Sequence, residues 1–249
     1  MWRDYIKRNR LRVLMYHAID SNDGDRLAVT PETFAEQMAY LANNGFQVIS
    51  LQAAIRALDD SASLDRAIVL TFDDGYRDFL TTAMPVLERY RFPATLFIVT
   101  KMSKDQWRRN GNAEALLSRE EIREIKRRGF SLGSHTVTHP DLTSVDDETL
   151  NRELTDSRAA IAQLGETFIP FAYPGGTFSR RERDAVERAG YDCGVIVGGR
   201  WGNGPETDRF LLKREPMLAS DSLDWFKKRV NGFYEAHYLM ARARGVETR

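Results

Sequence analysis

Apolar runs of strand length alternate along the chain with segments of helical periodicity, at intervals of about 20–35 residues. Two runs, 67–72 (AIVLTF) and 94–99 (ATLFIV), are apolar at nearly every position, as is typical of strands buried on both faces of a sheet. We expect strands at 12–18, 48–50, 67–72, 94–99, 130–134, 169–172, 193–197 and 210–214. This alternation predicts a parallel sheet with helical crossovers. Seven or eight such units favour a closed (β/α) barrel, with an open doubly wound sheet as the alternative.

Capping signals mark the ends of the expected helices. Thr30 followed by Pro31 is typical of a helix start, since proline is well tolerated in the first turn. Ser118 and Glu121 have the spacing of a capping box, and Gly129 ends the same helix. The remaining helices are expected at 77–90, 146–164 and 179–189.

Composition and charge exclude several classes of protein. Lys and Arg number 36, as do Asp and Glu, so the basic excess typical of nucleic-acid binders is absent and we expect no nucleic-acid partner. Cys193 is the single cysteine, which rules out an intramolecular disulfide and fits a reducing compartment. No apolar run reaches the ~18 residues of a membrane helix, and we identify no signal peptide. We therefore expect a cytoplasmic location.

We expect one domain over residues 1–249, with basic and aromatic terminal extensions at 1–11 and 220–249. Apolar or aromatic residues near the C-terminus recur at helical spacing, namely Phe226, Val230, Phe233, Tyr234 and His237. One hypothesis is that the two basic ends contact anionic lipid at the inner face of a membrane, each basic group contributing ~1 kcal/mol. The alternative is that the C-terminal apolar stripe packs on the barrel.

Chemically reactive residues follow the predicted strands, where the active sites of (β/α) barrels lie. Asp73 and Asp74 come directly after 67–72, and His135 and His139 follow 130–134. His17 follows the first strand, and the run Tyr173, Pro174, Gly175, Gly176 follows 169–172. The predicted barrel would bring these strand ends together.

Two histidines four residues apart predict a metal site. The intervening Thr-Val-Thr is a poor helix former, so His135 and His139 are expected on one loop. With a carboxylate they would form a His₂/carboxylate set that leaves positions open for water and substrate. Two adjacent carboxylates are costly when both ionise, and a metal beside one of them removes that cost. The alternatives are loop histidines bonded to backbone and a simple Asp-Gly turn.

Three motifs in this order resemble those of the polysaccharide deacetylases, carbohydrate esterase family four or the NodB homology domain. They are TFDDG at 71–75, HTVTH at 135–139 and FAYPGG at 171–176. The resemblance implies a single-domain distorted (β/α)₇ TIM-like barrel. It also implies a divalent metal, zinc first, with cobalt, nickel or manganese as alternatives. The implied reaction is hydrolysis of N-acetyl groups on an N-acetylhexosamine-containing glycan or glycolipid, releasing acetate and a free amino sugar.

The resemblance also implies roles for individual residues. Asp73 matches the general base, and Asp74, His135 and His139 match the metal ligands. Gly175 matches the residue whose backbone N–H binds the oxyanion. Tyr173, beside it, is a candidate substrate contact, and Tyr173 and Trp201 are candidate platforms for a sugar ring.

The chain departs from the family pattern at two places. The third motif often begins with an arginine that orients the base, but Ala172 stands there, and we expect Arg214 to take that role. The late Leu-x-His motif is absent, whereas Leu14–His17 (LMYH) is similar to the early Tyr-His of exopolysaccharide deacetylases with permuted motifs. In those proteins the early histidine is the general acid, and the resemblance assigns that role to His17.

Other functions are compatible with these residues. A catalytically silent sugar-binding protein could keep the same fold, and an O-acetyl or formyl group could replace the N-acetyl group. Two histidines and one carboxylate also form the facial triad of non-heme iron oxygenases. The strand–helix alternation and the second aspartate beside the ligand disfavour that alternative.

Overall fold

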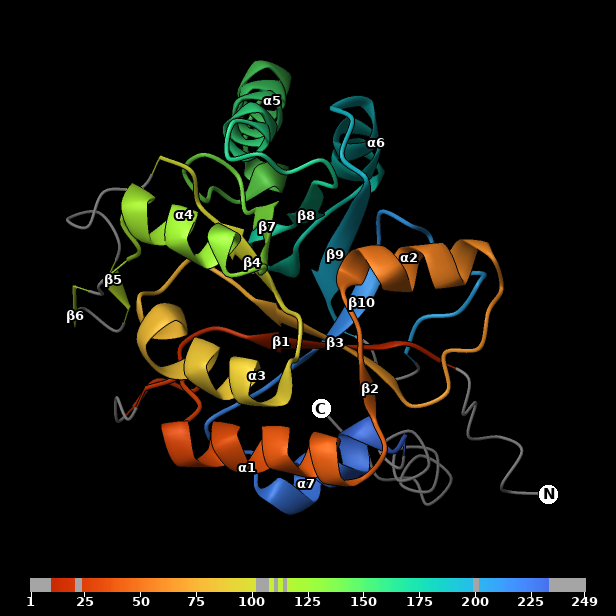
Figure 1. The fold of residues 1–249 in the computed structure, drawn as a ribbon. Coiled ribbons are helices and arrows are strands. Elements are labelled where there is room, and N and C mark those ends of the chain that lie inside the picture. The colour runs from red at the N-terminus through yellow and green to blue at the C-terminus, as the bar shows by residue number, and fades with distance from the viewer. Residues whose placement is uncertain are drawn as a thin grey trace, which may run out of the picture.

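Seven parallel strands close into a barrel in the computed structural model (Figure 1), which describes residues 10–20, 24–101, 108–109, 112–113, 116–198 and 202–232. They are β1 (Arg12–Tyr16), β3 (Ala67–Phe72), β4 (Thr95–Ile98), β7 (Ser131–Ser134), β8 (Pro170–Ala172), β9 (Cys193–Val197) and β10 (Leu212–Pro216). The order is β1-β10-β9-β8-β7-β4-β3, and β3 pairs again with β1. The predicted distorted (β/α)₇ barrel is therefore confirmed, and the open doubly wound sheet is wrong.

Among the described residues, three short strands lie outside the closed ring. β2 (Gln47–Val48) pairs in parallel with the first two residues of β3, while β4 pairs with its last two. β5 (Arg108–Arg109) and β6 (Asn112–Ala113) form a separate antiparallel pair. The predicted run 48–50 thus forms a strand at its start only, because Ser50 already caps the helix that follows.

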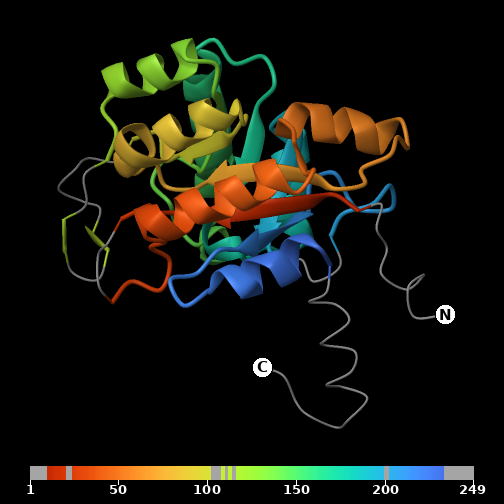
Figure 2. The ribbon, with the colours of Figure 1, turned by 60° about the horizontal axis from the view of Figure 1, so that its bottom comes forward.

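Helices surround the barrel, as Figures 1 and 2 show from two directions. They are α1 (Pro31–Asn43), α2 (Leu51–Asp59), α3 (Met84–Tyr90), α4 (Arg119–Arg127), α5 (Asp147–Ala162), α6 (Arg180–Arg188) and α7 (Leu223–Val230). The Thr30 cap and the Ser118–Glu121 capping box are both present. α2 has no counterpart among the expected helices, because its apolar start follows the short strand β2 without a break.

The segment 77–90 is less regular than the single helix we expected. Phe79–Ala83 forms a π-helical turn, and α3 begins only at Met84. Pro85 stands in the first turn of α3. Because proline has no N–H and clashes with the preceding turn, it is not compatible with the interior of one continuous α-helix.

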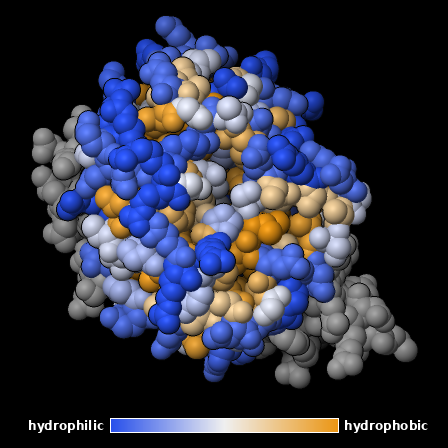
Figure 3. Space-filling model, viewed as in Figure 1, coloured by the Kyte–Doolittle hydropathy of each residue, from blue (hydrophilic) through white to orange (hydrophobic). Residues whose placement is uncertain are grey.

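Alternation along the strands sorts their side chains into two cores. Inward-facing residues of β1, β3, β4, β8, β9 and β10 pack inside the barrel with Leu51, Ala54 and Ile55 of α2. Outward-facing residues form the larger core with the surrounding helices. Figure 3 shows hydrophilic residues over the outer helices and apolar residues near the middle of this face, beside α2. α2 therefore covers the end of the barrel where the strands begin.

The start of the expected C-terminal extension packs on the barrel. Figure 2 shows α7 beside α1, and Phe226 of α7 is buried with its ring 6.3 Å from that of Tyr40 in α1. Val230 is also buried, so these two residues follow the alternative of packing on the barrel. Phe233, Tyr234, His237 and residues 1–9 lie outside the described residues. Contact with a membrane stays a prediction.

Within the described part of the chain, no helix has the length and apolar character needed to cross a membrane.

Candidate metal centre and active site

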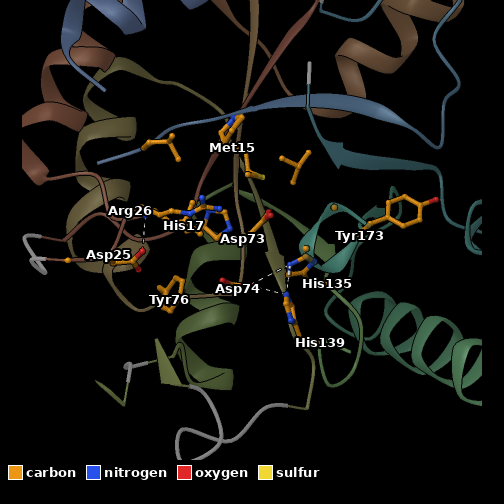
Figure 4. A pocket seen from close by; sticks show the side chains of 17 residues that line it. Met15, His17, Asp25, Arg26, Asp73, Asp74, Tyr76, His135, His139 and Tyr173 are labelled. Carbon is orange, nitrogen blue, oxygen red and sulfur yellow. Dashed lines mark hydrogen bonds and ion pairs between the residues drawn. The ribbon is translucent and has the colours of Figure 1, made fainter. Parts of the chain in front are cut away.

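A pocket of about 730 Å³ lies at the carboxyl ends of the strands (Figure 4). Inward alternation explains its polar lining, since His17, Asp73 and His135 each continue the inward-facing set of a strand. Asp74 and His139 line the same pocket. The structure thus brings together residues that lie more than a hundred positions apart in the sequence.

Asp74, His135 and His139 converge on one point. The Nε2 atoms of the two imidazoles are 3.2 Å apart, and Asp74 Oδ1 lies 3.5 Å from that of His135 and 3.7 Å from that of His139. Two ligands bound about 2.0–2.1 Å from a tetrahedral zinc ion are roughly 3.3 Å from each other. The three side chains therefore fit a single divalent ion.

Hydrogen bonding and burial leave the two imidazoles ready to act as ligands. His135 Nδ1 donates to the carbonyl oxygen of Ala172 at 2.8 Å, which leaves the Nε2 lone pair facing Asp74. Burial lowers the pKa of His135 to about 3, and burial also lowers the pKa of His139. Both rings are therefore neutral near pH 7, as metal binding requires.

The loop that bears these histidines is not helical, as predicted. Thr136 and His139 have φ values of 69° and 60°, in the left-handed region that side-chain-bearing residues rarely adopt. Such a conformation costs about 1–3 kcal/mol per residue, most clearly for a β-branched residue such as Thr136. Thr136 Oγ1 accepts a hydrogen bond from His139 N at 2.9 Å and helps to close the turn.

Asp73 forms a buried, two-point ion pair with Arg214. The guanidinium donates from Nη1 to Oδ1 at 2.6 Å and from Nη2 to Oδ2 at 2.7 Å, and it also donates to Thr71 Oγ1. Burial opposes ionisation of Asp73, but the charge and hydrogen bonds of Arg214 outweigh it, and the pKa of the carboxyl is lowered from 3.8 to about 2. The arginine expected from the sequence therefore contacts Asp73, from a strand other than the one that carries Ala172.

In Figure 4, His17 lies on one side of Asp73, and His135 and His139 lie on the other. It follows β1, which pairs directly with β3, the strand that leads into Asp73. Its charge is among the influences that lower the pKa of Asp73. The Asp73 carboxylate thus lies between the imidazole of His17 on one side and the imidazoles of His135 and His139 on the other.

The glycine turn after β8 contributes backbone rather than a side chain to the pocket. Gly175 lines the pocket with a φ of 62°, inside the short turn Pro174–Gly176. Tyr173, predicted as a substrate contact, is among the residues that line the pocket, but its ring points away from the other labelled side chains in Figure 4. The ring is buried, with its centroid 5.0 Å from that of Phe171 and 5.6 Å from that of Phe178. The Tyr173 ring is therefore not accessible as a platform for a sugar. Trp201 lies outside the described residues.

Two charged residues of the pocket have no counterpart in the sequence prediction. Asp25 and Arg26 line it from the segment between β1 and α1, and Asp25 accepts a hydrogen bond from Leu27 N at 2.8 Å. They do not follow an apolar run, so the strand-end criterion does not find them. A search for charged residues in the long connection after the first strand would have included both.

Comparison with known proteins identifies the family. The sequence profile described as polysaccharide deacetylase matches residues 60–194, more than half of the chain. The chain belongs to the polysaccharide deacetylase family. The matched segment contains Asp73, Asp74, His135, His139 and Gly175, whereas His17 and Arg214 lie outside it.

Several relatives of this deacetylase-family chain are similar over most of its length. YxkH of Bacillus subtilis (strain 168), named as a polysaccharide deacetylase, is 30% identical over 199 residues, which cover 79% of this chain and 67% of that protein. A poly-beta-1,6-N-acetyl-D-glucosamine N-deacetylase of Staphylococcus aureus (strain N315) is 21% identical over 239 residues, covering 92% of this chain and 81% of the relative.

Solved structures share the fold. The Streptococcus pyogenes deacetylase PplD, in complex with acetate, is 27% identical with a TM-score of 0.79, and the match covers 89% of this chain and 98% of that one. The Bacillus anthracis protein BA0330, described as a polysaccharide deacetylase, is 26% identical with a TM-score of 0.73, and the match covers 89% of this chain and 69% of that one.

Proposed function

We propose that this chain is a metal-dependent hydrolase that removes N-acetyl groups from an N-acetylhexosamine-containing glycan or glycolipid. One observation carries the proposal. Asp74, His135 and His139 converge to within ligand distance of one another, and the ionised Asp73, held by Arg214, lines the same pocket. A catalytically silent sugar-binding protein would not need this combination of a metal-type donor set and a separate anionic base.

The three converging side chains would hold the ion, and zinc suits their two nitrogens and one oxygen best. When bound, a divalent metal supplies Lewis-acid chemistry, acidifying a water molecule and polarising the acetamide carbonyl. The protein supplies a partly apolar site for this chemistry, since Met15, Leu218 and Val197 line the same pocket.

Asp73 is the proposed general base. Its carboxylate accepts a proton from the water that attacks the carbonyl carbon, and its low pKa keeps it ionised at neutral pH. Arg214 fixes both carboxylate oxygens, so the base meets its substrate in one orientation. A free aspartate would sample several rotamers.

Gly175 and His17 complete the proposed mechanism. The backbone N–H of Gly175 donates to the oxyanion of the tetrahedral intermediate, and the close approach is helped by the absence of a side chain. The imidazolium of His17 donates a proton to the departing nitrogen as the C–N bond breaks. The products are acetate and a free amino sugar, so one water molecule is consumed for each acetamide cleaved.

The relatives support the choice of substrate class. The Staphylococcus aureus relative is named for poly-β-1,6-N-acetylglucosamine, and the Streptococcus pyogenes structure contains acetate, which is the expected product. We infer that N-acetylglucosamine units are the first substrates to test on this chain.

Acetate release from a panel of N-acetylated oligosaccharides, with metal analysis of the same preparation, tests the proposal. The panel includes β-1,4- and β-1,6-linked N-acetylglucosamine oligomers and an O-acetylated xylan. We expect release from the N-acetylated members, loss of activity on removal of the metal, and recovery with Zn²⁺ or Co²⁺. Activity confined to the O-acetylated member would reassign the substrate, and full activity without metal would overturn the mechanism.

Asp73→Asn and His135→Ala separate the two roles. The amide cannot accept a proton, so Asp73→Asn should retain the metal while turnover falls by about 10²–10⁴-fold. His135→Ala should lose most of the bound metal along with its activity. Full metal occupancy in His135→Ala would show that the ligand assignment is incorrect.

A further inference from the structure

The loop from His135 to His139 needs support from elsewhere in the fold. Its two residues with left-handed backbone, Thr136 and His139, bracket the turn that directs both imidazoles toward Asp74. Such a backbone persists only where surrounding contacts hold it. The internal bond from His139 N to Thr136 Oγ1 closes the turn but does not attach it to the barrel.

Two sets of contacts attach this loop to the rest of the protein. The backbone N–H groups of Thr100 and Lys101, which follow β4, donate to the carbonyl oxygens of Thr136 and Val137 at 3.1 and 3.0 Å. Glu153, on the buried side of α5, provides the second set. Its Oε2 accepts hydrogen bonds from Val137 N at 2.7 Å and Thr138 N at 3.0 Å. Its Oε1 accepts a third from Thr138 Oγ1 at 2.7 Å. Val137 and Thr138 are the two central residues between Thr136 and His139. A single carboxylate therefore binds both central residues of the turn.

The surroundings of Glu153 indicate a dedicated contact. The side chain is buried, with the residue only 5% exposed, and among the described residues no Lys or Arg forms an ion pair with it. A buried carboxylate without a cationic partner depends on hydrogen-bond donors, and the donors here all belong to the loop between the histidines. Glu153 and the loop conformation therefore stabilise each other.

The same face of α5 also supports the start of the loop. Ser157, one turn after Glu153, contacts Ser134 Oγ at 2.9 Å, and Ser134 Oγ accepts a hydrogen bond from Thr136 N. Tyr191 OH reaches the same Ser134 hydroxyl at 2.9 Å. Ser134 directly precedes His135, so α5 fixes the chain on entry to the loop and at its centre.

We propose that Glu153 is a positioning residue of the metal centre, whose carboxylate holds the loop so that His135 and His139 face Asp74 before any metal arrives. This inference rests on the proposed function, because it takes these three residues as metal ligands. Without Glu153 the loop relaxes toward ordinary backbone angles and the two Nε2 atoms separate. Metal binding must then restore the conformation, and the apparent affinity falls by the fraction of molecules that still hold it.

Three variants of the full chain test the role of Glu153. Glu153→Ala removes all three acceptor contacts, and Glu153→Gln keeps the shape and one acceptor oxygen. Asp156→Asn is the matched control, since it removes an acidic charge from an exposed position on the same helix. Each metal-free protein is titrated with Co²⁺ against a competing chelator, and the visible absorption spectrum of the bound ion is recorded.

We expect Glu153→Ala to weaken Co²⁺ binding by about 10–100-fold and to change the visible spectrum, as for other residues that orient metal ligands. Glu153→Gln should fall between Glu153→Ala and the unsubstituted chain, whereas Asp156→Asn should match the latter. Thermal unfolding with and without Zn²⁺ separates a structural role from a positioning one. A purely structural role lowers both melting temperatures equally, while a positioning role reduces the increase that Zn²⁺ produces.

Wild-type affinity and spectrum in a folded Glu153→Ala would overturn the inference. If Glu153→Ala does not fold, the same result in Glu153→Gln overturns it. Failure of the unsubstituted chain to bind Co²⁺ or Zn²⁺ would instead remove the proposed metal centre itself. The two failures are therefore distinguishable, because only the second appears in the protein without substitutions.

Discussion

Asp73 shows how one buried residue depends on partners from distant parts of the chain. Burial alone would favour the neutral acid, and the two-point contact with Arg214 reverses that preference. The pKa of the Asp73 carboxyl in the folded protein lies below 3.8, the ordinary value for an aspartate. Ionised Asp73 therefore contributes to the stability of the folded protein above about pH 4. That contribution is lost as the pH falls from about 4 toward 2.

Arg214→Met should raise the pKa of Asp73, because burial favours the neutral acid and the guanidinium charge that offsets it is removed. We expect the acidic limb of the activity profile to move to higher pH and the free energy of unfolding at pH 7 to fall by about 3–5 kcal/mol. Urea denaturation and a pH series of acetate release measure the two effects. Arg209→Met, which breaks an exposed ion pair with Asp59, should cost about 0–1 kcal/mol and leave the profile unchanged. An unmoved acidic limb in Arg214→Met would contradict this account.

His17→Ala should keep the metal and slow the departure of the amine. The expected loss in kcat is about 10²–10⁴-fold, the usual range for a proton-transfer group. Metal content by mass spectrometry and kcat on an N-acetylglucosamine oligomer are the measurements. Wild-type turnover in this variant would mean that another group protonates the leaving nitrogen.

The sequence identifies residues of the site when they form contiguous motifs at strand ends. Asp73, Asp74, His135 and His139 belong to this class, and the structure brings all four to one pocket. Glu153 was not predicted, because in the sequence it is one of several acids on an amphipathic helix and only packing distinguishes it.

At the scale of the elements, alternation along each strand determines which side chains point into the barrel and toward the site. Alternation places Gly133 directly below His135 on β7, against the ring of Phe97. The same alternation turns Tyr173 outward, which is why its ring lies in the outer core although the motif places it beside Gly175. The positions of strands are predictable from apolar runs. Whether a given side chain points into or out of the barrel is not, because it depends on the exact residue at which the strand ends.

Gly133→Ala should destabilise the barrel and weaken metal binding together. An added Cβ would lie 2.5 Å from the Phe97 ring and 3.0 Å from Pro170, so β7 or its neighbours must shift. We expect a loss of about 1–3 kcal/mol in the free energy of unfolding. Urea denaturation and Zn²⁺ titration are the measurements, with Ser131→Ala on the same strand as the control. An unchanged free energy of unfolding in Gly133→Ala would show that the barrel interior accommodates the added methyl group, contrary to the prediction.

At the scale of the whole molecule, the alternation of runs predicts parallel strands and favours a closed barrel, but the strand pairs that close the barrel do not follow from it. β1 pairs with β3 on one side and β10 on the other, so strands about 200 residues apart meet, with Val13 aligned to Arg214. No local pattern encodes this pairing. The π-helical turn before α3, by contrast, has a local cause in Pro85.

Cys193 should report the opening of the closed barrel. The thiol is fully buried inside it, and burial raises the pKa of the thiol well above its usual value. The native protein should therefore resist alkylation by iodoacetamide, and labelling should begin only near the urea midpoint of unfolding. Mass spectrometry across a urea series measures this. Rapid labelling in buffer alone would contradict a stably closed barrel.

The pairing of β1 with β10 also sets an order of events during translation. The ribosome completes Asp74, His135 and His139 well before it reaches Arg214, and only the arrival of β10 beside β1 brings the guanidinium to Asp73. A nascent chain of about 200 residues thus carries every donor for an ion but lacks the partner of its base. On the proposed function, metal binding and catalytic competence would therefore be separate steps in the synthesis of the polypeptide, because Asp73 gains its Arg214 partner only when the last barrel strand is in place.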